Sequence, residues 1–162
     1  MNILVHATKA PMPKTRDAKR IAIFYAGILL VMAVAQLFTF DTFLVFFADF
    51  GLPGGTQFAY FLAAFLVTTE VFALPFLLRM SVSPAFRWVS MVCGWLAAGI
   101  WLGITVWLSL HDGMVNSVGL LGTVVDIIPG AWAVFMSIAF VLLAAWASWG
   151  MWPGKQESRK RK

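Results

Sequence analysis

The sequence of 162 residues has little charge, one cysteine and two histidines. Only 12% of its residues are charged and 61% are hydrophobic, whereas a soluble domain has about a quarter charged and about half apolar residues. This imbalance argues against a soluble enzyme. The single thiol, Cys93, excludes an internal disulfide, and together with His6 and His111 it is too little for a structural zinc or c-type haem site. We therefore expect no metal centre.

The net charge of +5 would suit nucleic acid, but the placement of the cations argues against it. All twelve lysines and arginines lie in residues 9–20, 79–87 and 155–162, and none interrupts a long apolar run. Basic residues that flank apolar runs are typical of cytoplasmic loops and favour an anionic lipid surface. We expect a lipid bilayer, and no nucleic acid, as their partner.

Four apolar runs have the length of about 20 residues that a membrane helix needs. They are residues 21–40, 57–78, 87–110 and 131–152. A cleavable signal peptide is the alternative for the first run, but its hydrophobicity continues past Ala35, so we expect a retained span. The sequence thus predicts an all-α integral membrane four-helix bundle, with one four-span domain over residues 21–152.

Two apolar connections lie between these runs. Residues 41–55 carry phenylalanines at helical spacing between Asp41 and Asp49, which predicts a short interfacial helix on the outer face. Residues 114–130 are interrupted by glycines, Asn116 and Pro129, and we expect a loop packed on the outer face. With four spans, the basic tails 1–20 and 153–162 both lie in the cytoplasm. This pattern predicts a multi-pass protein of the cytoplasmic (inner) membrane.

Glu70 is the most informative residue for function. It precedes Arg79 by nine residues, about 13 Å at 1.5 Å per residue, which is close to the middle of the bilayer. A carboxyl group at this depth costs several kcal/mol and normally faces the bundle interior. It is either a proton-active or ligand-contacting group, or a protonated side chain that joins helices by hydrogen bonds.

Other polar residues could share a pocket with Glu70. Thr69 precedes it, and Pro75 follows in the same run, where its missing N–H frees a backbone carbonyl and kinks the helix. Gln36 is the one strongly polar side chain of the first run, nearer the outer side, and its expected role is a hydrogen bond between helices. Glu70, Thr69, Gln36 and Asn116 are therefore candidates for one polar pocket.

Small residues in the third run predict close helix packing. Gly99 and Gly103 form a GxxxG pattern, and Gly94 with Ala98 repeats the spacing. Internal packing against a neighbouring span is the first interpretation, and oligomerisation is the second.

The order of these features resembles the DoxX/MauE-like family of small four-helix membrane proteins over residues 21–150. The resemblance lies in the turn Phe50-Gly51-Leu52-Pro53, in Glu70 followed by Leu74 and Leu77-Leu78, and in the segment Asn116-Ser117-Val118-Gly119-Leu120-Leu121-Gly122. That segment is similar to the Asn-Cys-Gly-Cys-Phe-Gly segment of MauE-type members, without its cysteines. Gln36-Leu37 stands where many members carry Lys-Leu. The family is linked to membrane redox systems, including thiosulfate:quinone oxidoreduction and maturation of disulfide-containing enzymes.

Three functions fit these patterns. The resemblance implies an accessory protein of a membrane redox or respiratory system, with Glu70 in a buried polar pocket and quinone as the one conceivable cofactor. The second is a non-catalytic structural or assembly subunit that binds other membrane subunits or its own copies. The third is a small transporter, which ranks last because no helix carries a line of polar residues. No catalytic group is evident, which favours a protein that is not an enzyme.

Overall fold

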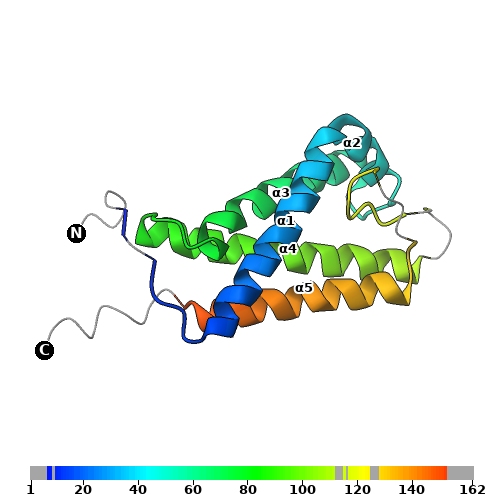
Figure 1. Cartoon of the computed structure of the whole chain (residues 1–162). Helices are drawn as coiled ribbons and strands as arrows, with labels where there is room; N and C mark the ends of the chain where they lie inside the picture. The colour runs from blue at the N-terminus through cyan, green and yellow to red at the C-terminus, as the bar shows by residue number, and fades with distance from the viewer. Residues whose placement is uncertain (1–6, 9, 112–114, 116, 125–127, 153–162) are drawn as a thin grey trace, which may run out of the picture.

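The computed structural model describes residues 7–8, 10–111, 115, 117–124 and 128–152, and this part of the chain contains five helices. In chain order they are α1 (Arg16–Phe38), α2 (Phe40–Ala48), α3 (Gly55–Leu77), α4 (Pro84–Leu110) and α5 (Ala131–Gly150) (Figure 1). The helices α1, α3, α4 and α5 are 20 to 27 residues long and apolar enough to cross a membrane. The predicted all-α four-helix membrane bundle, with a short helix after the first span, is confirmed.

The first span begins earlier than its hydropathy predicts, because capping residues precede the apolar run. The hydroxyl of Thr15 accepts a hydrogen bond from the backbone N–H of Ala18 at 3.1 Å, and Asp17 lies in the first turn. Both features stabilise a helix N-terminus. Consequently α1 begins at Arg16 rather than at residue 21, and the end of the predicted basic tail 1–20 is helical.

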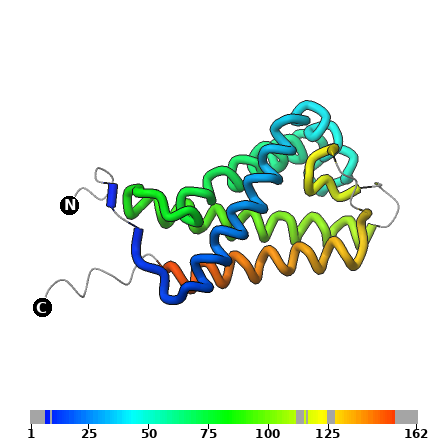
Figure 2. The backbone as a smooth tube through the Cα atoms, in the orientation of Figure 1, coloured from blue at the N-terminus to red at the C-terminus, as the bar shows by residue number. Residues whose placement is uncertain are grey.

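The four long helices form a closed ring. Each packs against two neighbours, in the order α1, α3, α4, α5 and back to α1 (Figure 2). Along the contact of α1 with α5, Ala18 and Ala22 have no exposed surface, and a Cβ on Gly150 would collide with the Cβ of Ala18. Small side chains therefore set the distance between these two helices.

Both ends of the membrane domain lie at the same end of the bundle. The backbone N–H of Lys14, just before α1, donates to the carbonyl of Gly150 at the end of α5 at 2.9 Å. The connection between α3 and α4 is also at this end, because Arg79 donates to Pro11 O at 3.1 Å and Arg87 donates to Thr8 O at 2.8 Å. We call it the basic end.

The opposite end, which we call the acidic end, holds Asp41 of α2 and Asp49 just after it. Here α2 buries Phe43 and Phe47, while residues 117–124 pack against α1 and α2 without forming a helix. A Cβ on Gly119 would lie 2.6 Å from the ring of Phe46, and Gly119 has a φ of 74° that favours glycine. The described part of the predicted loop 114–130 is thus a packed, non-helical segment.

Pro75 lies inside α3, and α4 supplies a hydroxyl that bonds to the α3 backbone on both sides of it. The hydroxyl of Ser90 accepts from the N–H of Phe76 at 2.9 Å and donates to the carbonyl of Ala73 at 3.2 Å. A neighbouring hydroxyl thus satisfies backbone groups around the proline, as membrane helices require. The polar side chain that bonds the backbone beside Pro75 is therefore Ser90 rather than Glu70.

The small residues of α4 divide between two faces. Gly94 is buried, and a Cβ there would lie 3.6 Å from the Cβ of Ala73, so it packs against α3. Gly99 and Gly103 are exposed, and a Cβ on either would meet no atom within 4 Å. The prediction that Gly99 and Gly103 pack inside the bundle is wrong, because both glycines lie on the exposed surface of α4.

Candidate functional site

Glu70 lies inside the bundle with no exposed surface. Its Oε1 atom accepts two hydrogen bonds, from the indole Nε1 of Trp101 at 2.8 Å and from the amide Nε2 of Gln36 at 3.4 Å. The three residues come from α3, α4 and α1, so one carboxyl oxygen joins three helices of the ring. Gln36, Glu70 and Trp101 form what we call the polar centre.

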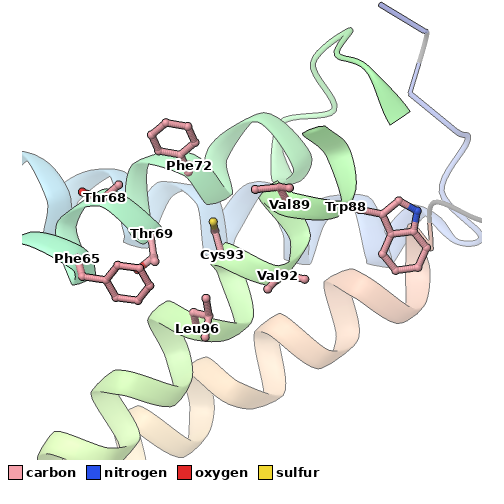
Figure 3. A pocket seen from close by; sticks show the side chains of 9 residues that line it. All are labelled: Phe65, Thr68, Thr69, Phe72, Trp88, Val89, Val92, Cys93 and Leu96. Atoms are coloured by element: carbon pink, nitrogen blue, oxygen red, sulfur yellow. The ribbon is translucent and has the colours of Figure 1, made fainter. Parts of the chain in front are cut away.

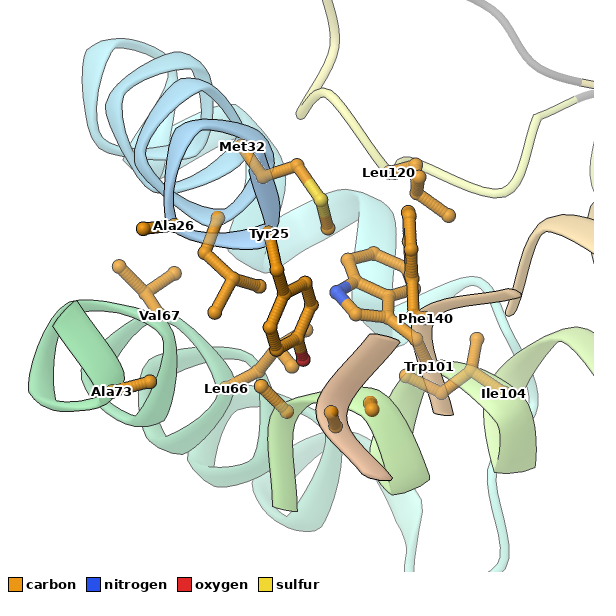
Figure 4. Close-up of a cluster of buried hydrophobic side chains, with 14 of the residues drawn as sticks. Tyr25, Ala26, Met32, Leu66, Val67, Ala73, Trp101, Ile104, Leu120 and Phe140 are labelled. Carbon is orange, nitrogen blue, oxygen red and sulfur yellow. The ribbon is translucent and has the colours of Figure 1, made fainter. Parts of the chain in front are cut away.

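Trp101 is fixed by aromatic packing as well as by its hydrogen bond. Its ring meets Phe47 of α2 edge to face, with centroids 6.4 Å apart. Figure 4 shows the indole in the same buried cluster as Tyr25, Met32 and Leu120. Because the indole has little room to move, its N–H is held towards the carboxyl group.

Gln36 connects the polar centre to the segment at the acidic end. Its Nε2 donates to the carbonyl of Leu120 at 3.1 Å as well as to Glu70. The close approach of this segment needs glycine, since a Cβ on Gly122 would lie 2.6 Å from the hydroxyl of Thr39 and 3.3 Å from the Cα of Gln36. Residues 117–124 therefore cover the polar centre from the acidic end.

A second set of buried hydroxyls extends from Trp101 towards α5. Thr105 donates to the carbonyl of Trp101 at 2.9 Å, and its Oγ1 lies 3.0 Å from the hydroxyl of Ser137. Thr105 and Ser137 are both fully buried. All four long helices thus contribute polar side chains to a connected group at the bundle core.

The predicted pocket residues do not all meet. Gln36 contacts Glu70 directly, which its depth along the first span left open. Thr69 is buried, but its hydroxyl donates to Leu66 O of its own helix at 2.8 Å, and its side chain lines a groove on another face of α3. Asn116 lies outside the described residues. Pro75 is one and a half turns further along α3 and is bridged by Ser90.

That groove has a volume of about 430 Å³ and lies between α3 and α4 (Figure 3). Its walls are almost wholly apolar side chains, with Thr68 and Thr69 on one side and Cys93 on the other. Glu70 is not part of the lining. The groove can therefore hold an apolar chain or ring, but its occupant would not touch the buried carboxyl.

Sequence reasoning missed Trp101, although a usable signal was present. Trp101 stands midway between Gly99 and Gly103, and residues two apart on a helix point to nearly opposite faces at 100° per residue. Once the glycines are placed on the outer face, the tryptophan must point to the core. A tryptophan at mid-span also needs a partner for its N–H, and the carboxyl of Glu70 is the obvious acceptor.

Within the described residues, no three histidine, cysteine or acidic side chains lie close enough to hold a metal ion. No protein-family model, curated protein or solved structure matches the chain. The molecule is a multi-pass membrane protein whose four spans enclose a buried carboxyl group.

Proposed function

We propose that the chain is an accessory subunit of a membrane redox or respiratory system, and that Glu70 is its proton-active group. The observation that carries this proposal is the fully buried carboxyl, held by Trp101 and Gln36 in the core of a membrane bundle. Ionisable side chains in such positions are expensive and mark proton relays or ligand contacts. The resemblance to DoxX/MauE-like proteins supports the redox association.

Quinone is the cofactor class that the groove between α3 and α4 would suit. Its volume lies within the range of about 300–1,000 Å³ for small-molecule sites, and its apolar lining fits an isoprenoid tail. In this arrangement the bound molecule would lie against Thr69, and Glu70 would act from the other face of α3. The protein contributes position and a proton, and the redox chemistry belongs to the complex.

The orientation in the membrane is part of the same proposal. In the described residues the basic end carries six cations and one acid, namely Lys14, Arg16, Lys19, Arg20, Arg79 and Arg87 against Asp17. The acidic end carries Asp41 and Asp49. Positive charge near the ends of spans favours the cytoplasmic side. Both termini would then face the cytoplasm, in the inner membrane.

The decisive experiment replaces Glu70 with glutamine in the chain's own membranes. Glu70→Gln keeps the shape of the side chain but removes its ability to release a proton, so quinone-linked electron transfer or proton uptake should fall at least tenfold. Asp49→Asn, an exposed acid, is the matched control and should leave the rate unchanged. Unchanged activity of Glu70→Gln would refute the proton-active role.

A non-catalytic structural or assembly subunit is the second candidate, and the exposed GxxxG face of α4 favours it. Gly103 lines a hollow of about 280 Å³ between α3 and α4, beside Leu62 and Trp107. Such a face lets another helix approach closely. Gly103→Leu should abolish co-purification of partner subunits in mild detergent, whereas Gly27→Leu, at an exposed and open glycine of α1, should not. A lone monomer from the wild-type chain would exclude this candidate.

A further inference from the structure

The polar centre has two buried acceptors without a donor. Within the described residues, neither the Oε2 atom of Glu70 nor the Oε1 atom of Gln36 has a hydrogen-bond partner. A buried polar atom left unpaired is destabilising, and the cost applies here to two neighbouring side chains. Two acceptors of the polar centre therefore lack a donor.

The nearby donors are already used. The amide of Gln36 has two N–H groups, and these donate to Glu70 Oε1 and to Leu120 O. The single N–H of Trp101 donates to Glu70 Oε1. The hydroxyl of Tyr25 donates to the carbonyl of Gly94 at 2.9 Å. None of these groups can reach the two unpaired oxygens without breaking a bond that it already makes.

We propose that Glu70 binds one proton on Oε2 and donates it to Oε1 of Gln36, so that the two side chains form a cyclic acid–amide pair. One half of this pair exists already, as the bond from Gln36 Nε2 to Glu70 Oε1. The two unpaired oxygens belong to the same carboxyl and the same amide group as that bond. A single hydrogen on Oε2 therefore satisfies both, and it closes the contact between α1 and α3 with two parallel hydrogen bonds.

The surrounding charges favour the neutral acid. Within the described residues the only ion pair joins Arg20 to Asp17, so no cation compensates a carboxylate at Glu70. The elements packed around it carry further ionisable groups: Arg16, Asp17, Lys19, Arg20 and Tyr25 on α1, Cys93 and Arg87 on α4, and Asp41 on α2. Of the cations, Arg16, Lys19 and Arg20 lie in the first two turns of α1 at the basic end, and the guanidinium of Arg87 is bonded to Thr8 and Val82 at the same end. An unpaired carboxylate in hydrocarbon is costly.

A water molecule is the rival way to fill the same place. Its two hydrogens could donate to both unpaired oxygens and leave Glu70 ionised. The two arrangements differ in one measurable property, which is the state of the carboxyl group itself. The inference is independent of which complex the chain joins, because it concerns the side chains of this chain alone.

Infrared spectroscopy of the full chain in lipid at neutral pH distinguishes them. A protonated Glu70 gives a carboxylic acid C=O band that shifts in D₂O and is lost in Glu70→Gln, whereas Asp17→Asn, at an exposed acid, leaves it unchanged. An ionised Glu70 gives no such band, and Glu70→Gln then removes carboxylate absorption instead. That second result overturns the proposal.

Gln36→Leu tests whether Gln36 accepts the hydrogen bond from the protonated Glu70. This variant also tests the proposal if Glu70→Gln fails to fold. Gln36→Leu removes both hydrogen bonds of the pair, the donor to Glu70 Oε1 and the acceptor of the hydrogen on Oε2, so the acid band should move to higher frequency. A band at an unchanged position would show that the hydrogen goes elsewhere and would overturn the acid–amide pair. In Glu70→Gln two amides can form the same cyclic pair, so its thermal midpoint should stay close to that of the wild type.

Discussion

At the scale of single residues, Glu70 is the residue around which the polar centre is arranged. One of its oxygens is bonded to Trp101 and Gln36, and the whole side chain is enclosed by α1, α3 and α4. Enclosure of this kind separates the carboxyl group from lipid and from the groove of α3 and α4. The protein can thus keep a polar group at mid-span without exposing it to hydrocarbon.

The indole of Trp101 is the stronger of the two donors to Glu70. Trp101→Phe keeps the aromatic packing against Phe47 but leaves Glu70 Oε1 with the longer bond from Gln36. A hydrogen bond in a membrane core is worth about 1 kcal/mol, so a clear fall in the thermal midpoint is expected in detergent or lipid. Trp132→Phe, at a side chain that is 69% exposed, should have no comparable effect. Equal midpoints for the two variants would contradict the assigned bond.

At the scale of helices, hydropathy identified the spans but not the faces that meet. The four apolar runs and the short Phe-rich helix were predictable because each crossing needs a long helix without charge. The face on which a glycine lies was not predictable, since Gly94 and Gly99 both stand among apolar residues and yet only Gly94 is packed against another helix. The contact between Gln36 and Glu70 was not predictable either. It depends on helix tilt, which cannot be obtained by counting residues from the end of a span.

The contact of α3 with α4 offers a test of how the backbone around Pro75 is stabilised. Ser90→Ala removes the hydroxyl that bonds both Phe76 N and Ala73 O, so the contact between α4 and the backbone of α3 loses two hydrogen bonds. We expect a loss of about 1–3 kcal/mol in the free energy of unfolding, measured by denaturation in mixed micelles. Ser109→Ala is the control, because that hydroxyl bonds only to Thr105 O of its own helix. A loss of the same size in Ser109→Ala would remove the special role of Ser90.

At the scale of the whole molecule, the ring of helices separates charge along its length. Because α1 begins and α5 ends at the same end as the connection of α3 with α4, sequence-distant cations gather there. The acids Asp41 and Asp49 lie at the other end. The even number of spans allowed the sequence to predict this separation of charge. The hydrogen bonds from Arg79 and Arg87 to the N-terminal residues were not predictable, because their acceptors are backbone carbonyls, which leave no pattern in the sequence.

The separation of charge predicts the orientation, and the single cysteine makes that prediction easy to test. Cys93→Ala gives a chain without thiols, into which Asp49→Cys or Ser81→Cys places one exposed thiol at the acidic or the basic end. In intact cells a membrane-impermeant maleimide should label Asp49→Cys, and it should label Ser81→Cys only after the membrane is opened. This labelling pattern is expected because basic residues near the ends of spans stay on the cytoplasmic side. Labelling of both positions from the same side would contradict the four-span topology. The reversed labelling pattern would contradict cytoplasmic termini, but it would not affect the description of the buried polar centre.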